Sequence, residues 1–199
     1  TQGTYHLLGL GLWTTLALRP LDEPITTSRL NAELWENTGL DRTFESGELL
    51  GSALLQVGWA MATYAIGKGA GKPGLAALGR DLVRVQTLTQ GVTQIIKYSV
   101  RRTRPDGSSN SSFPSGHTSG SFATATVLHR HYGWKAGVPA FSIASYIAAS
   151  RLSENKHFLS DVAFGAAIGL PLGAPSPSTV GRPGLRSRRW PWPVAPECR

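Results

Sequence analysis

The chain has 199 residues, a formal net charge of +8, 41% apolar residues and 9% aromatic residues. This length favours a single domain with a sizeable core, and the composition excludes collagen-like, coiled-coil and disordered chains. Cys198 is the only cysteine, which excludes an intramolecular disulfide and a four-cysteine zinc site.

The first predicted element is a helix over the apolar run Tyr5–Leu18. The run is too short to span a bilayer and lacks the basic start of a signal peptide, so we expect a buried or interfacial helix. A short amphipathic helix is predicted over residues 26–37. The next predicted helix, Glu48–Gly67, has an uncharged core from Leu49 onward that is just long enough to cross a bilayer.

A long helix is predicted over Leu75–Arg102. The sequence Arg104-Pro105-Asp106-Gly107 ends it, because proline disfavours helical geometry in the residue before it. Gln86, Gln90 and Gln94 are spaced four apart and form one stripe on this helix. We interpret the stripe as a solvated or hydrogen-bonding face, with a substrate-lining face as the alternative.

Three more helices are predicted, at Ser115–Tyr132, Trp134–Leu152 and Phe158–Leu170. Prolines and arginines then recur without periodicity up to the last residue. We therefore predict an all-α bundle of about six helices within residues 1–174, followed by a disordered, basic, Pro/Arg-rich tail over residues 175–199.

Basic side chains are concentrated in the middle of the chain. Residues 1–50 contain three basic and seven acidic side chains, whereas residues 68–151 contain eleven basic and two acidic ones. A basic centre indicates an anionic partner, and composition alone does not distinguish phosphate, nucleic acid and a membrane surface.

One cluster in this basic region places Lys97, Arg101 and Arg104 at i, i+4 and i+7, on one face of the predicted helix. Three cations on one face repel each other unless an anion lies among them. A solvated basic face is the alternative interpretation.

A second cluster, Pro114-Ser115-Gly116-His117, lies at a predicted helix start. Free backbone N–H groups and the positive end of the helix dipole can bind an anion there. Gly116 allows close approach of that anion. Ser115 is also a good N-cap residue, and the sequence around it does not favour a nucleophilic serine.

The third cluster contains Arg151, His157 and Asp161. Four residues separate His157 from Asp161, so the carboxylate can accept the proton of one imidazole nitrogen and leave the other nitrogen free. A surface ion pair is one alternative. A metal site that includes His117 is another, but the surrounding cations favour an oxyanion over a divalent metal.

In this order and spacing the clusters resemble the signature of the type 2 phosphatidic acid phosphatase (PAP2) superfamily, which includes class A acid phosphatases and vanadium haloperoxidases. The pattern K-x6-R-P is matched by Lys97 to Pro105 and the pattern P-S-G-H by Pro114 to His117. The pattern S-R-x5-H-x3-D is matched by residues 150–161, so the resemblance covers about a third of the chain.

The resemblance implies a metal-independent phosphatase that works through a phosphohistidine intermediate and needs no cofactor. His157 would attack phosphorus, Asp161 would hold its imidazole, and His117 would protonate the leaving group. The phosphate oxygens would be bound by Lys97, Arg104, Ser115, Gly116 and Arg151. Vanadate is expected to inhibit such an enzyme.

Arg80, Asp81 and Arg84 lie within the long predicted helix, and later apolar stretches are short. We therefore expect an extracytoplasmic (periplasmic) protein that is soluble or peripherally membrane-associated, with an integral membrane protein as the alternative. The expected partner is a phosphate ester, with a lipid phosphate at a membrane surface as one option, and no nucleic acid.

Two other functions stay open. In a vanadate-dependent haloperoxidase, vanadate would be the cofactor in the same oxyanion site, although the short chain leaves little material for a halide pocket. A non-catalytic basic helical module would bind a membrane or nucleic acid and would give His157 no role.

Overall fold

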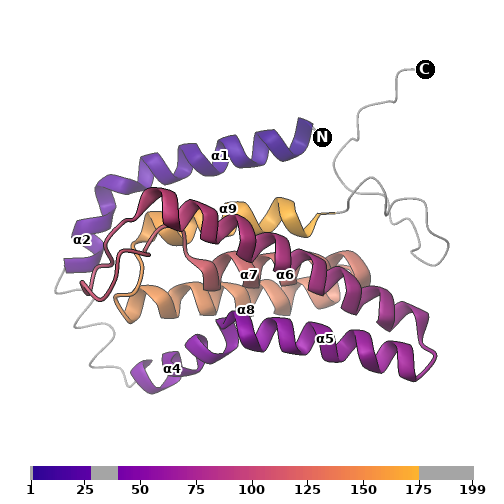
Figure 1. Ribbon diagram of the computed structural model, residues 1–199. Helices are drawn as coiled ribbons and strands as arrows, with labels where there is room; N and C mark the ends of the chain where they lie inside the picture. Colours follow the sequence, from indigo (N-terminus) through magenta and orange to yellow (C-terminus); the bar gives the residue numbers. More distant parts are fainter. Residues whose placement is uncertain (1, 28–39, 175–199) are drawn as a thin grey trace.

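The computed structural model describes residues 2–27 and 40–174, and every regular element in these ranges is a helix (Figure 1). The all-α prediction is therefore confirmed for the described residues. The helices are α1 (Gln2–Leu18), the 3-10 turn η1 (Arg19–Leu21), α2 (Asp22–Thr27), α4 (Leu40–Gly51), α5 (Ala53–Gly69), α6 (Pro73–Val100), α7 (Gly116–Tyr132), α8 (Trp134–Ser153) and α9 (Leu159–Gly173). Most of the helix predicted over 26–37 and the whole predicted tail lie outside the described residues.

Helix α7 is the centre of the bundle and packs against α6, α8 and α9. Helix α5 packs on α6, α4 packs on α8, and α1 lies on the outer side of α9 (Figure 1). Glycines permit these close approaches: a Cβ at Gly79 in α6 would lie 2.2 Å from the Tyr64 nitrogen in α5. A Cβ at Gly169 in α9 would lie 2.3 Å from the Ser119 carbonyl oxygen in α7.

The core between these helices is part apolar and part polar. The apolar part consists of small and branched side chains from α5, α6 and α7, namely Ala60, Leu78, Leu82, Val85, Ala123 and Val127. Gln86 is fully buried beside them, and its amide nitrogen donates to Gln56 Oε1 at 2.6 Å and to the Gly120 carbonyl at 3.0 Å. The hydrogen-bonding interpretation of the glutamine stripe is therefore confirmed for Gln86, whereas Gln94 is exposed.

Two predicted helix boundaries are wrong, each because of one residue. The predicted helix Glu48–Gly67 is interrupted at Ser52, which caps α5 by accepting a hydrogen bond from the Leu55 N–H at 3.3 Å. Helix α6 ends at Val100 because Arg101 takes a left-handed conformation with φ of 50°. Arg101 is consequently exposed and does not share a face with Lys97 as predicted.

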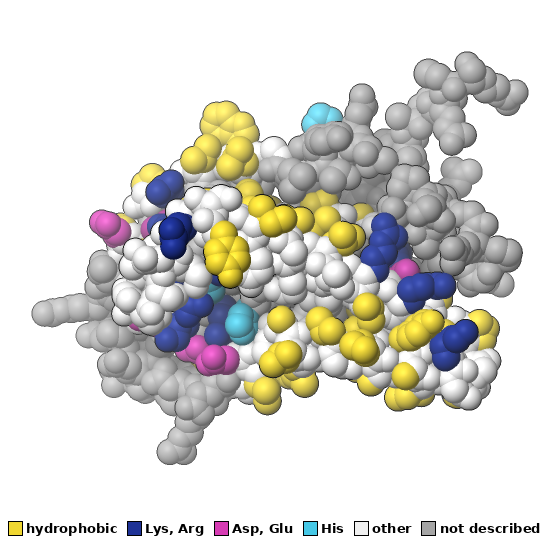
Figure 2. All heavy atoms as spheres, in the orientation of Figure 1, with side chains coloured by type: hydrophobic (Ala, Val, Ile, Leu, Met, Phe, Trp, Pro, Cys, Tyr) yellow, Lys and Arg dark blue, Asp and Glu magenta, His cyan; other side chains and the backbone are white. Residues whose placement is uncertain are grey.

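Helix α1 confirms the first predicted helix but is not buried. Leu10, Trp13 and Leu16 are exposed, whereas a Cβ at Gly11 would lie 2.2 Å from the Ala167 Cβ in α9. Apolar side chains also cover much of the visible face along α5 and α6 (Figure 2). None of the described helices is both long enough and apolar enough to cross a bilayer.

Candidate active site

The predicted site residues meet at one end of the bundle, where α6 and α8 end and α7 and α9 begin. Figure 2 shows a hollow at this end, in which basic, acidic and histidine side chains gather. The first turns of α7 and α9 are tied together, because the Ser115 N–H donates to the Asp161 carbonyl at 3.1 Å. Ser115 caps α7, as its hydroxyl accepts from the Thr118 N–H at 3.4 Å.

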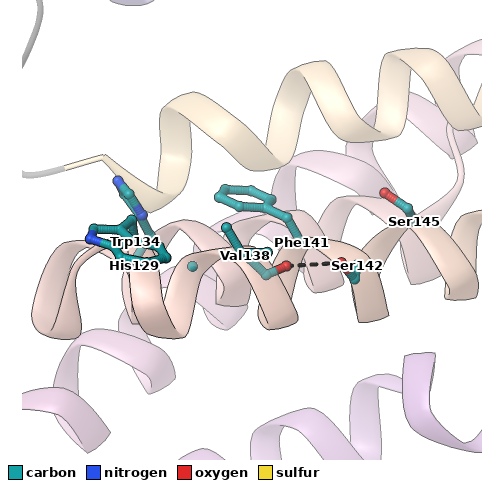
Figure 3. Close-up of a pocket in the computed structure, with 7 residues that line it drawn as sticks. His129, Trp134, Val138, Phe141, Ser142 and Ser145 are labelled. Atoms are coloured by element: carbon teal, nitrogen blue, oxygen red, sulfur yellow. Dashed lines mark hydrogen bonds between the residues drawn. The ribbon is translucent and has the colours of Figure 1, made fainter.

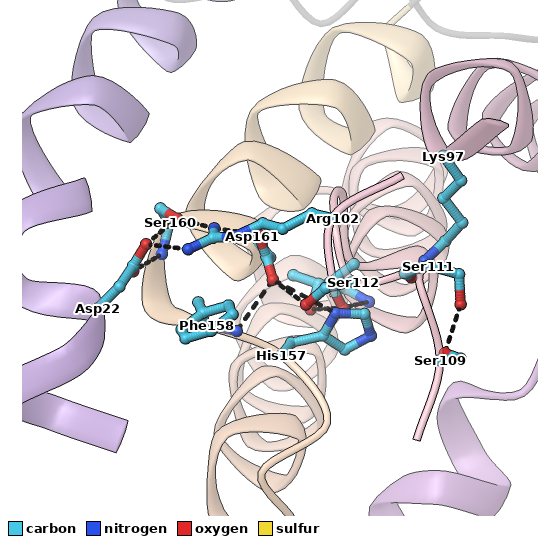
Figure 4. Close-up of polar contacts among 12 residues, drawn as sticks. Asp22, Lys97, Arg102, Ser109, Ser111, Ser112, His157, Phe158, Ser160 and Asp161 are labelled. Carbon is cyan, nitrogen blue, oxygen red and sulfur yellow. Dashed lines mark hydrogen bonds and ion pairs between the residues drawn. The ribbon is translucent and has the colours of Figure 1, made fainter. Parts of the chain in front are cut away.

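The pair formed by His157 and Asp161 lies at the centre of the site (Figure 4). His157 belongs to the segment between α8 and α9 and is 3% exposed. Its Nδ1 lies 3.8 Å from Asp161 Oδ2 and has no hydrogen-bond partner among residues 2–27 and 40–174. The predicted pairing is therefore present as a contact that is longer than a hydrogen bond.

Burial lowers the pKa of His157 below its ordinary value, because a charged imidazolium loses hydration inside the protein. Asp161 opposes this effect, whereas the positive charges of Lys97 and Arg104 add to it. The net direction is downward, so His157 is neutral at pH 7 and its second nitrogen carries a lone pair.

The Asp161 carboxylate is fully buried and held from several sides. Ser112 Oγ donates to its Oδ2 at 2.5 Å, and the Phe158 N–H donates to the same oxygen at 3.0 Å. Arg102 Nη1 donates to Oδ1 at 2.7 Å. This set of donors stabilises the ionised carboxylate and fixes the oxygen that faces His157.

Lys97 and Arg104 lie near His157, and Arg151 lies near His117 and Arg104. Lys97 and Arg104 are close enough to interact electrostatically with each other and with His157. Arg104 Nε is buried and has no hydrogen-bond partner within the described part of the chain. Arg151 is 2% exposed and donates to Glu154 Oε1 at 2.5 Å. A buried guanidinium nitrogen without a hydrogen-bond partner, close to two further cations, is suited to binding an oxyanion.

The loop after α6 brings Arg104 into this position. Its N–H donates to the Ser109 carbonyl at 2.9 Å, which closes the loop on itself. The loop is fixed to the His157 segment because Lys156 Nζ donates to the Asp106 carboxylate at 2.7 Å. The Asp106 N–H also donates to the Asn155 carbonyl at 3.2 Å.

His117 is the second residue of α7 and lies near Arg151 and His157. Its ring donates to the backbone carbonyl of Glu48, and a Cβ at Gly51 would lie 2.7 Å from its Cδ2. The end of α4 therefore covers one side of the histidine. Gly116, directly before it, faces the Lys97 side chain, since a Cβ there would lie 4.0 Å from Lys97 Cε.

Four residues that contact the His–Asp pair or its partners were not expected from the sequence: Asp22, Arg102, Ser112 and Ser160. Arg102 belongs to the basic stretch 101–104, but no pattern in the sequence indicates that its side chain points into the bundle. Asp22 is far away in the sequence, and no motif includes it.

A groove lies elsewhere, between α7 and α8 (Figure 3). It has a volume of about 640 Å³ and is lined by apolar side chains such as Trp134 and Phe141. His129 is its single titratable side chain, and none of the predicted site residues reaches it.

Comparisons with known proteins agree with this arrangement. The sequence model of the PAP2 superfamily matches residues 80–182. A lipid A 1-phosphatase of Porphyromonas gingivalis is 43% identical over 89 residues, which cover 43% of this chain and 20% of that protein. The match thus spans about a fifth of the length of this curated relative.

The fold is similar to that in the crystal structure of a transmembrane PAP2 type phosphatidylglycerolphosphate phosphatase from Bacillus subtilis. The TM-score is 0.64 at 23% identity, and the match covers 87% of this chain and 93% of that chain.

This structural match contradicts the expected soluble or peripherally associated periplasmic protein, because the chain with the shared fold is a transmembrane protein. The expectation rested on three charged residues in α6 and on the short apolar stretches after it, and in the structure Arg80 and Arg84 are exposed. Asp81 is turned into the bundle, where Arg130 and His131 pair with it. Leu88 and Ile95 on the same helix are exposed.

Proposed function

This chain belongs to the PAP2 superfamily, and we propose that it is a phosphatase that hydrolyses the phosphate monoester of a lipid. One observation carries the proposal. A buried, neutral His157 faces an ionised Asp161 and is surrounded by cations, among which Arg104 Nε has no hydrogen-bond partner in the described residues.

In the first step, His157 Nε2 attacks the phosphorus of the bound ester. An N–P bond forms while the bond between phosphorus and the leaving oxygen breaks, and His117 donates a proton to that oxygen. The lipid leaves as an alcohol. Asp161 stabilises the charge that develops on the imidazole, because its Oδ2 faces His157 Nδ1.

In the second step, water attacks the phosphohistidine. His117 accepts a proton from this water, the N–P bond breaks, and inorganic phosphate and neutral His157 are regenerated. Lys97, Arg104 and Arg151 hold the equatorial phosphoryl oxygens in both steps, with the Ser115 hydroxyl and the Gly116 N–H. Their contribution is electrostatic, since the negative charge of the transition state is spread over these oxygens.

Two observations support a lipid as the substrate. The similar proteins act on lipid A and on phosphatidylglycerolphosphate, according to their names. In this chain, Ile95, Tyr98 and Val100 are exposed on the part of α6 that carries Lys97. An apolar surface beside a cation cluster suits a molecule with a phosphate head and acyl chains.

Phosphate release tests the proposal directly. The purified protein is given a lipid phosphate, a nucleoside monophosphate and p-nitrophenyl phosphate, each in the presence of EDTA. We expect the highest kcat/KM for the lipid, inhibition by vanadate, which mimics five-coordinate phosphorus, and no effect of EDTA. Loss of activity on chelation with recovery on adding a divalent metal would contradict the proposal, and so would bromination with vanadate and peroxide in place of hydrolysis.

A further inference from the structure

The polar contacts behind the His–Asp pair extend to the N-terminal helices. We propose that Arg102 and Asp22 are positioning residues for the reaction, which hold the Asp161 carboxylate so that one of its oxygens faces His157. This inference rests on the proposed function. Asp22 lies outside the stretch that matches the family, residues 80–182, so the family pattern does not assign it a role.

Arg102 joins two carboxylates that are remote in the sequence (Figure 4). Its Nη1 donates to Asp161 Oδ1 at 2.7 Å, and its Nη2 donates to Asp22 Oδ2 at 2.8 Å. The guanidinium carbon lies 3.9 Å from the centre of the Phe158 ring, which supports it from one side. A planar guanidinium with two ends in use and one face covered has little freedom to move.

Asp22 is the second anchor of this arrangement and is 2% exposed. Its Oδ1 accepts from the Ser160 N–H at 2.9 Å, and its Oδ2 accepts from Ser160 Oγ at 2.6 Å. Ser160 directly precedes Asp161 in the first turn of α9. Asp22 therefore holds both the arginine and the backbone next to the carboxylate that the arginine contacts.

The left-handed residue at the end of α6 makes these contacts possible. Because Arg101 has a φ of 50°, the helix stops and the next side chain turns toward α2 and α9. The Arg102 carbonyl accepts from the Ser112 N–H at 2.9 Å, which places Ser112 Oγ within reach of Asp161. The two neighbouring arginines thus have different surroundings: Arg101 is exposed, and Arg102 is partly buried between two acids.

The consequence for catalysis follows from how the two Asp161 oxygens are used. Arg102 donates to Oδ1. Oδ2 is then left to face His157, and it also accepts hydrogen bonds from Ser112 Oγ and the Phe158 N–H. Without the arginine, the carboxylate can rotate and offer either oxygen to other donors. Misplacement of a catalytic group by about 1 Å can reduce a rate about 100-fold.

Kinetics of Arg102→Gln and the matched control Arg101→Gln test the proposal, because both remove one charge from adjacent positions. We expect kcat of Arg102→Gln to fall about 10- to 100-fold with KM nearly unchanged, since the phosphate-binding cations are untouched. Arg102→Lys, which can keep one of the two ion pairs, should recover part of the loss. Arg101→Gln should keep the kcat of the unmodified protein.

Asp22→Asn extends the test to the N-terminal helices. It should lower kcat in the same way, and the double variant with Arg102→Gln should be no slower than the slower single variant, because both act through one contact. Equal kcat for Arg102→Gln and Arg101→Gln would overturn the proposal. A raised KM at unchanged kcat would also overturn it, since Arg102 would then bind substrate.

A spectroscopic measurement separates this inference from the proposed function. The His157 Nδ1 proton is identified in the proton NMR spectrum as the signal that is lost in His157→Gln. We expect this signal to move in Arg102→Gln and in Asp22→Asn but not in Arg101→Gln, even if no phosphate ester is hydrolysed. An unchanged signal in all three variants would show that Arg102 does not position the pair.

Discussion

The two ends of the bundle contain the same three residue types in contact, and they use them differently. At the far end, Asp81 in α6 meets Arg130 and His131 in α7, and both contact its Oδ2, the histidine at 3.0 Å. At the site end, Asp161 meets Arg102 through Oδ1 and faces His157 through Oδ2 at 3.8 Å.

The two ends differ in how the cations around the acid are paired. At the far end, the acid contacts the histidine at hydrogen-bond distance and forms an ion pair with the arginine. At the site end, Lys97 and Arg104 add charge that the buried pair does not neutralise, and Arg104 Nε has no hydrogen-bond partner in residues 2–27 and 40–174. An Asp–Arg–His cluster therefore stabilises a helix contact at one end and can bind an anion at the other.

Replacing one histidine at each end should give the largest difference in activity between the two ends. His157→Gln should lower kcat by about 10⁴-fold or more, because no other group can form the covalent intermediate. His131→Gln should leave kcat within about twofold of the unmodified protein, since its imidazole hydrogen-bonds with the acid and the arginine of the far end. Initial rates with a lipid phosphate measure both. Wild-type activity in His157→Gln would refute its role as nucleophile.

The motif residues of the site end could be predicted from the sequence, because their spacing along helices and helix starts fixes which side chains meet. Lys97, Ser115 and Arg151 all lie where the patterns placed them. The contact between Asp22 and Arg102 could not be predicted, since it joins segments 80 residues apart through tertiary packing. The left-handed conformation of Arg101 could not be predicted either, because it is a property of one residue that hydrophobic periodicity does not indicate.

The expected localisation shows a second kind of information that the sequence does not contain. The expectation of a soluble or peripheral protein used Arg80, Asp81 and Arg84, of which the structure turns Asp81 alone inward, to Arg130. Whether a charge faces outward or into the bundle depends on the register of the helix against its neighbours, which the sequence alone does not give.

Removing the second histidine of the site should have an effect that depends on the substrate. His117→Ala should slow hydrolysis of an alkyl phosphate by about 10²- to 10⁴-fold, because an alkoxide needs a proton to leave. Hydrolysis of p-nitrophenyl phosphate should slow much less, since nitrophenolate leaves without help. The ratio of the two kcat/KM losses is the measurement, and equal losses would show that His117 only positions phosphate.

The far-end cluster should affect stability and leave catalysis unchanged. Asp81→Asn leaves Arg130 without its charged partner in a mostly buried position, and should lower the free energy of unfolding by about 2 kcal/mol. Thermal unfolding monitored by circular dichroism measures the change. The folded fraction should keep its kcat, and a large loss of kcat at unchanged stability would mean that the two ends are coupled.

The pH dependence offers the smallest expected effect. Because burial and nearby cations lower the pKa of His157, its neutral form persists below the ordinary value of about 6.5. Activity should therefore be lost as the pH falls through the folded-state pKa of His157, while the need for a protonated His117 limits activity on the alkaline side. The acid limb of kcat/KM against pH should lie below 6.5, and a limb above that value would contradict the lowered pKa of His157.

The most direct test of the account is to trap the covalent intermediate. The protein is mixed with p-nitrophenyl phosphate, whose nitrophenolate leaves without a proton from His117, then quenched in base, where phosphohistidine is stable, and digested for mass spectrometry. We predict a phosphoryl group on His157 that accumulates in His117→Ala, disappears on acid treatment and is missing in His157→Gln. Phosphate on Ser115, or hydrolysis at full rate with no phosphorylated histidine at any quench time, would contradict the account.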